Sequence, residues 1–169
     1  TLKEEKMLSF TSSLSPDCEA FAIFVTEKYD YKNKKNILSY LTENDYVKCL
    51  EHYNFCVPHL IRKIHFNPKK PENHNIYISN LKNNYVMVYN GNKWLIRDRD
   101  DSIQDIIDKN EGIIEQKIEE WIEKGKDYPD IMKKFNKYLE KKENDKVLNK
   151  IKSEIKLMLF NNRDMISSV

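Results

Sequence analysis

Residues Ile64 to Trp94 run IHFNPKKPENHNIYISNLKNNYVMVYNGNKW, and this stretch decides the fold that the sequence predicts. It leads through three short runs rich in β-branched and aromatic residues, NIYIS at 75–79, YVMVY at 85–89 and KWLIR at 93–97. Such runs favour strands. The residues between them, LKNN and NGN, are typical of tight hairpin turns. The stretch therefore predicts a three-stranded antiparallel meander over residues 75–98.

Strand periodicity places alternate side chains of the first run on opposite faces, with Ile76 and Ile78 on one face and Tyr77 on the other. A sheet of three short strands is only marginally stable alone, so it must pack against helices. The rest of the chain supplies them, because apolar residues recur there at helical spacing. We therefore predict an α+β fold, with a small antiparallel meander packed against helices and a helical C-terminal region.

The helices are predicted over 43–66 and 101–160. Thr42 and Asp45 have the spacing of a capping box, with Asp in place of the usual Glu. Pro58 is placed as the first residue of a second helix within 43–66. Gly112 is expected to break or bend the helix that begins near residue 101, and Gly125 is expected to end it.

The predicted domain organisation has two parts. Residues 1–16 are interpreted as a helical connector and linker, and residues 17–169 as a single α+β domain. Within the domain, the run AFAIFV in the segment 18–31 favours a further strand. Residues 163–169 are expected to be frayed. The chain has no apolar run long enough to cross a membrane and no secretory leader, so an intracellular protein is expected.

A polar corner leads from the predicted helix into the meander. Pro68 and Pro71 make the chain there stiff and extended. Around them stand two histidines and two asparagines, His65, Asn67, His74 and Asn75. One interpretation is a histidine-type nuclease with Mg²⁺ or Mn²⁺, in which a neutral imidazole deprotonates water and the cation binds the phosphate. The other is turn chemistry, which is favoured because no Asp or second ligand pair stands at a recognisable offset.

Two further groups have the chemistry of metal ligands. Cys49, His52, Cys56 and His59 are zinc-type residues, but structural zinc sites usually draw ligand pairs from separated elements, which argues against zinc here. The acids Asp98, Asp100, Asp101 and Asp105 are either divalent-metal ligands or helix starters. The chain has 3 cysteines and no CxxC, which favours a reducing compartment without a disulfide framework.

Charge is unevenly distributed although the formal net charge is only +2. The centre of the chain has a basic excess, which is able to meet a phosphate backbone. The candidate nucleic-acid-binding residues are Arg62, Lys63, Lys69, Lys70, Lys82, Lys93 and Arg97. The alternative is that these charges form a solvated face balanced by the acidic helix that follows.

Four strings carry a resemblance to a known family: LTENDY at 41–46, the quoted stretch, DRDD at 98–101, and FNKYLEKKENDKVLNKIKSEIKLMLFNNR at 135–163. Together they resemble the C-terminal domain of giant-virus proteins of the Mimivirus type. In those proteins a two-Cys/two-His zinc finger and a helical connector precede this domain. The resemblance covers roughly residues 37–163, does not include the finger, and brings no catalytic residue with it. It implies a location in the host cytoplasm or a viral factory.

The function expected from the sequence is a non-enzymatic module of a viral protein, associated with DNA or RNA or used for assembly and partner binding. No cofactor is expected for that function. The first alternative is the metal-dependent nuclease centred on the histidine–asparagine corner. The second is an oligomerisation domain, in which residues 1–10 extend a coiled coil and the chain forms a homo-oligomer.

Overall fold

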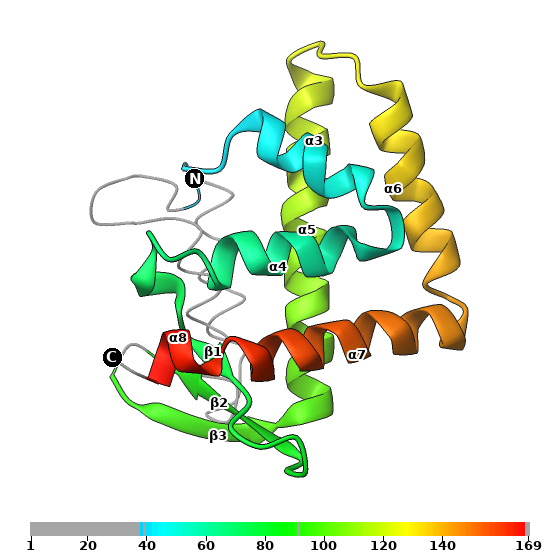
Figure 1. Cartoon of the computed structure of the whole chain (residues 1–169). Coiled ribbons are helices and arrows are strands. Elements are labelled where there is room, and N and C mark those ends of the chain that lie inside the picture. Colours follow the sequence, from blue (N-terminus) through cyan, green and yellow to red (C-terminus); the bar gives the residue numbers. More distant parts are fainter. Residues whose placement is uncertain (1–37, 39, 91, 168–169) are drawn as a thin grey trace, which may run out of the picture.

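The computed structural model describes residues 38, 40–90 and 92–167 (Figure 1). The predicted connector at 1–16 and the predicted strand within 18–31 lie outside the described residues. Within them the chain forms an α+β fold in which a three-stranded sheet packs against helices and the C-terminal half is helical. The predicted fold class is confirmed.

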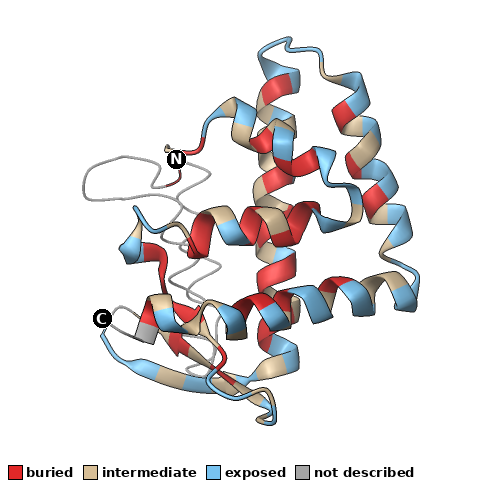
Figure 2. Ribbon diagram, viewed as in Figure 1, coloured by how far each residue is buried: buried red, intermediate tan, exposed pale blue. Residues whose placement is uncertain are grey.

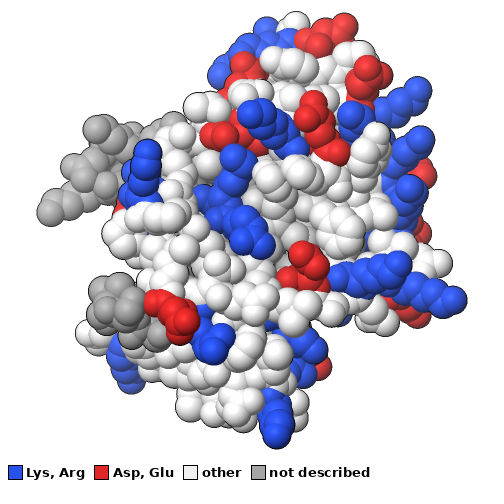
Figure 3. All heavy atoms as spheres, viewed as in Figure 1, with Lys and Arg blue, Asp and Glu red and all other residues white. Residues whose placement is uncertain are grey.

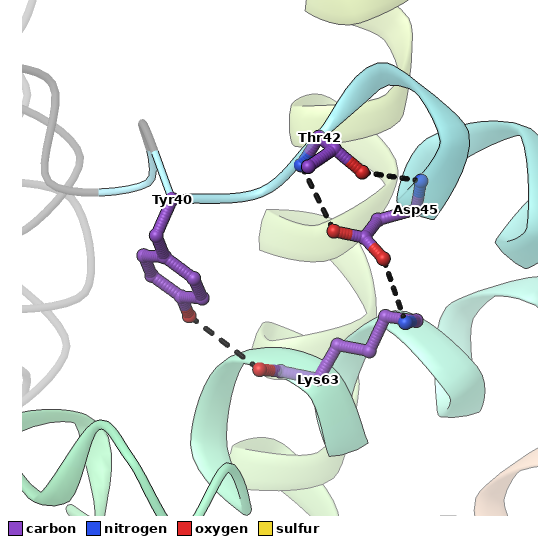
Figure 4. Close-up of polar contacts among 4 residues, drawn as sticks. All are labelled: Tyr40, Thr42, Asp45 and Lys63. Carbon is purple, nitrogen blue, oxygen red and sulfur yellow. Dashed lines mark hydrogen bonds and ion pairs between the residues drawn. The ribbon is translucent and has the colours of Figure 1, made fainter.

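Helix α3 spans Glu43–Glu51 and begins with the predicted capping box. The amide of Asp45 donates to Thr42 Oγ1 at 3.1 Å, and the amide of Thr42 donates to the Asp45 carboxylate at 2.9 Å. Lys63 Nζ donates to the other carboxylate oxygen at 3.0 Å, and the Tyr40 hydroxyl donates to the Lys63 carbonyl at 3.4 Å (Figure 4). One cap therefore both starts α3 and ties it to the next long helix.

A 3₁₀ turn, η2 (Tyr53–Phe55), leads into helix α4 (Cys56–His65). The prediction that Pro58 opens this helix was wrong, because α4 begins two residues earlier. Proline is tolerated anywhere in the first turn, where backbone N–H groups have no partner inside the helix. Residues Leu60, Ile61 and Ile64 form the buried stripe of α4.

The sheet consists of β1 (Ile76–Tyr77), β2 (Tyr85–Tyr89) and β3 (Trp94–Asp98), in the order β1-β2-β3 with antiparallel pairing. The predicted meander is therefore confirmed. Its second turn is stabilised by Asn90, whose side-chain oxygen accepts from the amides of Asn92 and Lys93 at 2.9 and 2.8 Å. Its inner face carries the fully buried Ile76, Ile78, Val86 and Val88, together with the half-buried Leu95 and Arg97 of β3.

Helix α5 (Arg99–Glu123) runs without a break through Gly112, so the expected break at that residue was wrong. The helix ends as predicted at Gly125, which has φ +66°. Helices α6 (Pro129–Lys141) and α7 (Asp145–Asn161) follow. Residues expected to be frayed instead form α8 (Arg163–Ser167), in which Ile166 is buried.

Figure 1 shows how the helices enclose the core. The long α5 passes behind α3 and α4, α6 runs back alongside it, and α7 crosses it near the sheet. Figure 2 shows that the buried residues of α4 and α5 lie where these helices cross. The sheet is fixed to α7 by a hydrogen bond from the Ile78 amide to the Leu159 carbonyl, 3.1 Å long. The helices therefore cover one face of the sheet, and the other face points away from them.

A buried polar group joins α5 to α6. Glu111 is only 7% exposed and accepts from the Tyr138 hydroxyl at 2.6 Å and from Lys142 Nζ at 2.7 Å. Both partners of this carboxylate are donors, so its charge is compensated inside the protein. The group orients two helices and is not open to a ligand.

Candidate nucleic-acid interface

The corner between α4 and β1 is a buried hydrogen-bonded network. His65 is 4% exposed, and its Nδ1 lies 3.1 Å from the Asn73 carbonyl and 2.9 Å from Asn75 Oδ1. A carbonyl only accepts, so Nδ1 carries the proton and donates. Burial lowers the pKa of His65 to about 4, which keeps the ring neutral at pH 7.

His74 has a similar role on the other side of the corner. Its Nε2 donates to the Asn67 carbonyl at 2.7 Å, while its Nδ1 is buried without a hydrogen-bond partner among the described residues. The Asn67 side chain accepts from the amide of Lys69 at 3.0 Å. Both imidazoles are therefore packed and bonded to backbone carbonyls, an arrangement typical of side chains that fix a chain reversal.

The nuclease alternative needs an imidazole that reaches water or substrate beside a bound cation. The four corner residues, His65, Asn67, His74 and Asn75, instead bond to one another and to the backbone, with His74 Nδ1 as the exception. No group of three or more His, Cys, Asp or Glu in the part of the chain that the structure describes is placed to hold a metal ion. The geometry therefore favours the turn-chemistry interpretation.

The zinc-type residues do not assemble either. Cys49 and Cys56 are fully buried thiols, and burial raises the pKa of each to about 12. The rings of His52 and His59 stack on each other with centroids 4.0 Å apart. The acids are also occupied: Asp98 caps α5, Asp100 lies 3.9 Å from Arg99, and Asp105 lies 3.6 Å from Arg97.

The basic residues predicted to meet phosphate divide into two sets. Three of them are held in ion pairs, Lys63 with Asp45 at 3.0 Å, Lys70 with Glu72 at 3.8 Å and Arg97 with Asp105 at 3.6 Å. The other four, Arg62, Lys69, Lys82 and Lys93, are exposed. Figure 3 shows Lys and Arg interleaved with Asp and Glu over the helices instead of forming one patch, while the surface over the sheet is mostly uncharged with separate basic groups.

Sheet topology decides which exposed lysines are neighbours. The amide of Tyr89 donates to the Asn75 carbonyl at 2.9 Å, so the corner lies at the same end of the sheet as the β2–β3 turn with Lys93. Lys69, in the corner, belongs to that end. Lys82 lies in the β1–β2 turn, at the opposite end of the meander. The basic excess of the sequence is therefore split along the length of the sheet.

The outer face of the sheet carries a group of aromatic and apolar side chains that we call the outer face residues: Tyr77, Tyr85, Met87, Tyr89, Trp94 and Ile96. Trp94 is 37% exposed and Ile96 is 65% exposed. The Trp94 ring lies 5.1 Å from the Tyr77 ring, edge to face, and 5.3 Å from the Tyr89 ring. Three strands therefore contribute to one aromatic cluster, in which Trp94 is exposed and the two tyrosines are half-buried.

Sequence reasoning placed Tyr77 on the face opposite Ile76 but did not identify this surface. The signal was present in β2, where Tyr85, Met87 and Tyr89 alternate with Val86 and Val88. Because both sets are apolar, alternation alone does not say which one faces the helices.

Comparisons with protein-family models, with curated proteins and with solved structures find no match for this chain. Among the described helices, none has the length and apolar character that a bilayer span requires.

Proposed function

We propose that this chain is a non-enzymatic nucleic-acid-binding module, which holds DNA or RNA by its exposed cationic side chains. The observation that carries the proposal is the set of four exposed basic residues, Arg62, Lys69, Lys82 and Lys93, left after the ion pairs are counted. Histidines bonded to backbone carbonyls support binding over cleavage.

The same observation sets the expected strength of binding. Each phosphate that a cation neutralises releases condensed counterions, so the logarithm of affinity falls with the logarithm of salt concentration by about 0.7 to 0.9 per contact. Four contacts give a slope of roughly −3. Such a domain binds weakly alone and contributes most when it is linked to a second binding unit.

The resemblance to giant-virus proteins supports that setting. A zinc finger preceding this domain would bind first, and the domain would then bind the same strand intramolecularly. The location in the host cytoplasm or a viral factory belongs to this proposal and rests on the resemblance alone.

The test is a fluorescence-anisotropy titration of labelled DNA and RNA over a series of salt concentrations. The double variant Lys82→Glu/Lys93→Glu removes two of the four exposed candidate residues. Its matched control is Lys133→Glu/Lys137→Glu, which makes the same charge change at exposed positions of α6. We expect the first variant to bind at least ~10-fold more weakly than the control at low salt and to reduce the salt slope by about 2.

Two results would remove the proposal. One is the absence of binding to any nucleic acid at the lowest salt concentration. The other is an equal loss in the two double variants, which would mean that only the net charge matters.

A further inference from the structure

We infer that the outer face of the β1-β2-β3 sheet is a stacking surface for the bases of single-stranded nucleic acid. This inference rests on the proposed function and names both the ligand class and the place where it binds.

The aromatic cluster has the geometry that stacking needs. Tyr77, Tyr89 and Trp94 come from β1, β2 and β3, and the Trp94 ring lies next to both tyrosine rings. The Tyr77 ring meets Trp94 at an interplanar angle of 76° and the Tyr89 ring meets it at 46°. Because neither tyrosine stacks flat on the indole, Trp94 keeps ring surface open to solvent and is 37% exposed.

The composition of the face favours bases over an apolar protein partner. Four of the six outer face residues are aromatic, and three of those are tyrosines, whose rings present both an apolar surface and a hydroxyl. Aromatic rings on a sheet stack with bases of any sequence. A purely aliphatic face would instead suit another apolar surface, and here only Met87 and Ile96 are of that kind.

The charged residues at the two ends of the sheet indicate where the nucleic-acid strand binds. Lys93 directly precedes Trp94, so a cation stands beside the aromatic cluster at this end of the sheet. The opposite end carries the exposed acid Asp98, paired across the sheet with Tyr85. Lys82, in the β1–β2 turn, stands at that same opposite end, and Asp98 offsets part of its attraction for phosphate. Phosphates are therefore attracted most to the Lys93 end, which places the bound strand over Trp94.

Single strands are preferred because their bases can unstack from one another and stack on protein side chains. In a duplex the bases are stacked inside and present only their edges, so a flat aromatic face has nothing to stack with. The cations would still attract duplex, but without the stacking contribution. The inference therefore predicts a preference for single strands over duplex of the same length.

The experiment combines tryptophan emission with anisotropy on the full chain. The protein has 2 tryptophans, and Trp121 is 1% exposed, so quenching by a thymidine oligonucleotide reports on Trp94. We expect quenching by single-stranded DNA, little quenching by duplex, and a loss of affinity of about 5- to 100-fold in Trp94→Ala. The control Phe55→Ala removes another exposed aromatic ring, in η2, and should bind like the wild type.

The contrary outcomes separate this inference from the function on which it rests. Equal binding of single strands and duplex, with Trp94→Ala unchanged, overturns the stacking surface and leaves the binding module in place. No nucleic-acid binding at all overturns both. Light scattering that shows a dimer broken by Trp94→Ala would assign the face to a second copy and overturn the inference. Trp94 emission insensitive to acrylamide in the free protein would show the face already covered, with the same consequence.

Discussion

His65 is the residue on which the corner between α4 and β1 depends most. Its Nδ1–H holds the Asn73 carbonyl and the Asn75 side chain, so one ring links the end of α4 to the start of β1. Because the ring is buried, protonating it is unfavourable, and its pKa is lowered to about 4. The corner is therefore stable only while this imidazole is neutral.

That dependence predicts a pH effect on stability. Below the ordinary histidine pKa of 6.5 the unfolded chain binds a proton that the native ring does not, down to the native pKa of about 4. The free energy of unfolding should therefore be highest above about pH 6.5 and decrease as the pH falls toward about 4. The expected loss between about pH 7 and pH 5 is roughly 2 kcal/mol. Urea unfolding at these two pH values measures the loss.

The variant His65→Gln should be less stable at neutral pH and lose the part of this pH dependence that comes from His65. Burial also lowers the pKa of the partly exposed His59 to about 4, so His59→Gln should remove a second part of the pH dependence without loosening the corner. A His65→Gln protein with the full wild-type pH dependence would show that the corner is not what titrates.

Local features such as a helix cap were predicted from the sequence more easily than contacts between distant residues. The capping box of Thr42 and Asp45 is local, and it was found from spacing alone. The hydrogen bond from Lys63 to the same carboxylate joins residues 18 positions apart, and no local sequence pattern predicts it. This is why Lys63 was predicted to meet phosphate although the fold pairs it with Asp45.

At the scale of elements, two glycines have opposite roles, one inside α5 and one just beyond its C-terminal end. Gly112 lies inside the helix, and a Cβ added there would meet nothing within 4 Å. Gly125 has φ +66°, and its amide donates to the Ile122 carbonyl while the amide of Lys126 donates to that of Trp121. These two bonds form the Schellman motif that ends a helix at a left-handed glycine.

The two substitutions to alanine should therefore have opposite signs. Gly112→Ala removes backbone freedom from the unfolded chain and should stabilise the protein by about 0.5 to 1 kcal/mol. Gly125→Ala places a Cβ in the left-handed region and should destabilise it by about 1 kcal/mol. Urea midpoints of the two variants and the wild type test this, and destabilisation by Gly112→Ala would mean that α5 bends there as the sequence first indicated.

The sheet shows where sequence analysis stops at this scale. The predicted tight turn LKNN at 81–84 is part of a longer connection over residues 78–84, and β1 is shorter than predicted. The strands and the turn between β2 and β3 were predicted, because β-branched runs and Asn-Gly turns are local signals. The outward direction of Tyr89 and Trp94 was not, because it depends on which face α5, α7 and α8 cover. In the same way, Cys49, His52, Cys56 and His59 are close in sequence, but the fold buries the thiols and stacks the imidazoles on each other.

At the scale of the whole molecule, the described domain has two different sides. The helical side carries mixed charges, and Figure 3 shows them interleaved. The sheet side carries the outer face residues, with Lys93 at one end and Lys82 at the other. The sequence predicted the basic excess but not this division, which follows from the meander topology. The central claim is that nucleic acid binds on the sheet side and does not use the buried imidazoles of His65 and His74.

An NMR titration of the labelled protein with a single-stranded oligonucleotide tests this claim most directly, because each backbone amide and each indole N–H reports separately. We expect shifts concentrated on β1, β2, β3 and the indole of Trp94, with the buried indole of Trp121 and the α5–α6 surface unchanged. Shifts centred instead on α6, or on the ring nitrogens of His65 and His74 with the strands unaffected, would contradict the account.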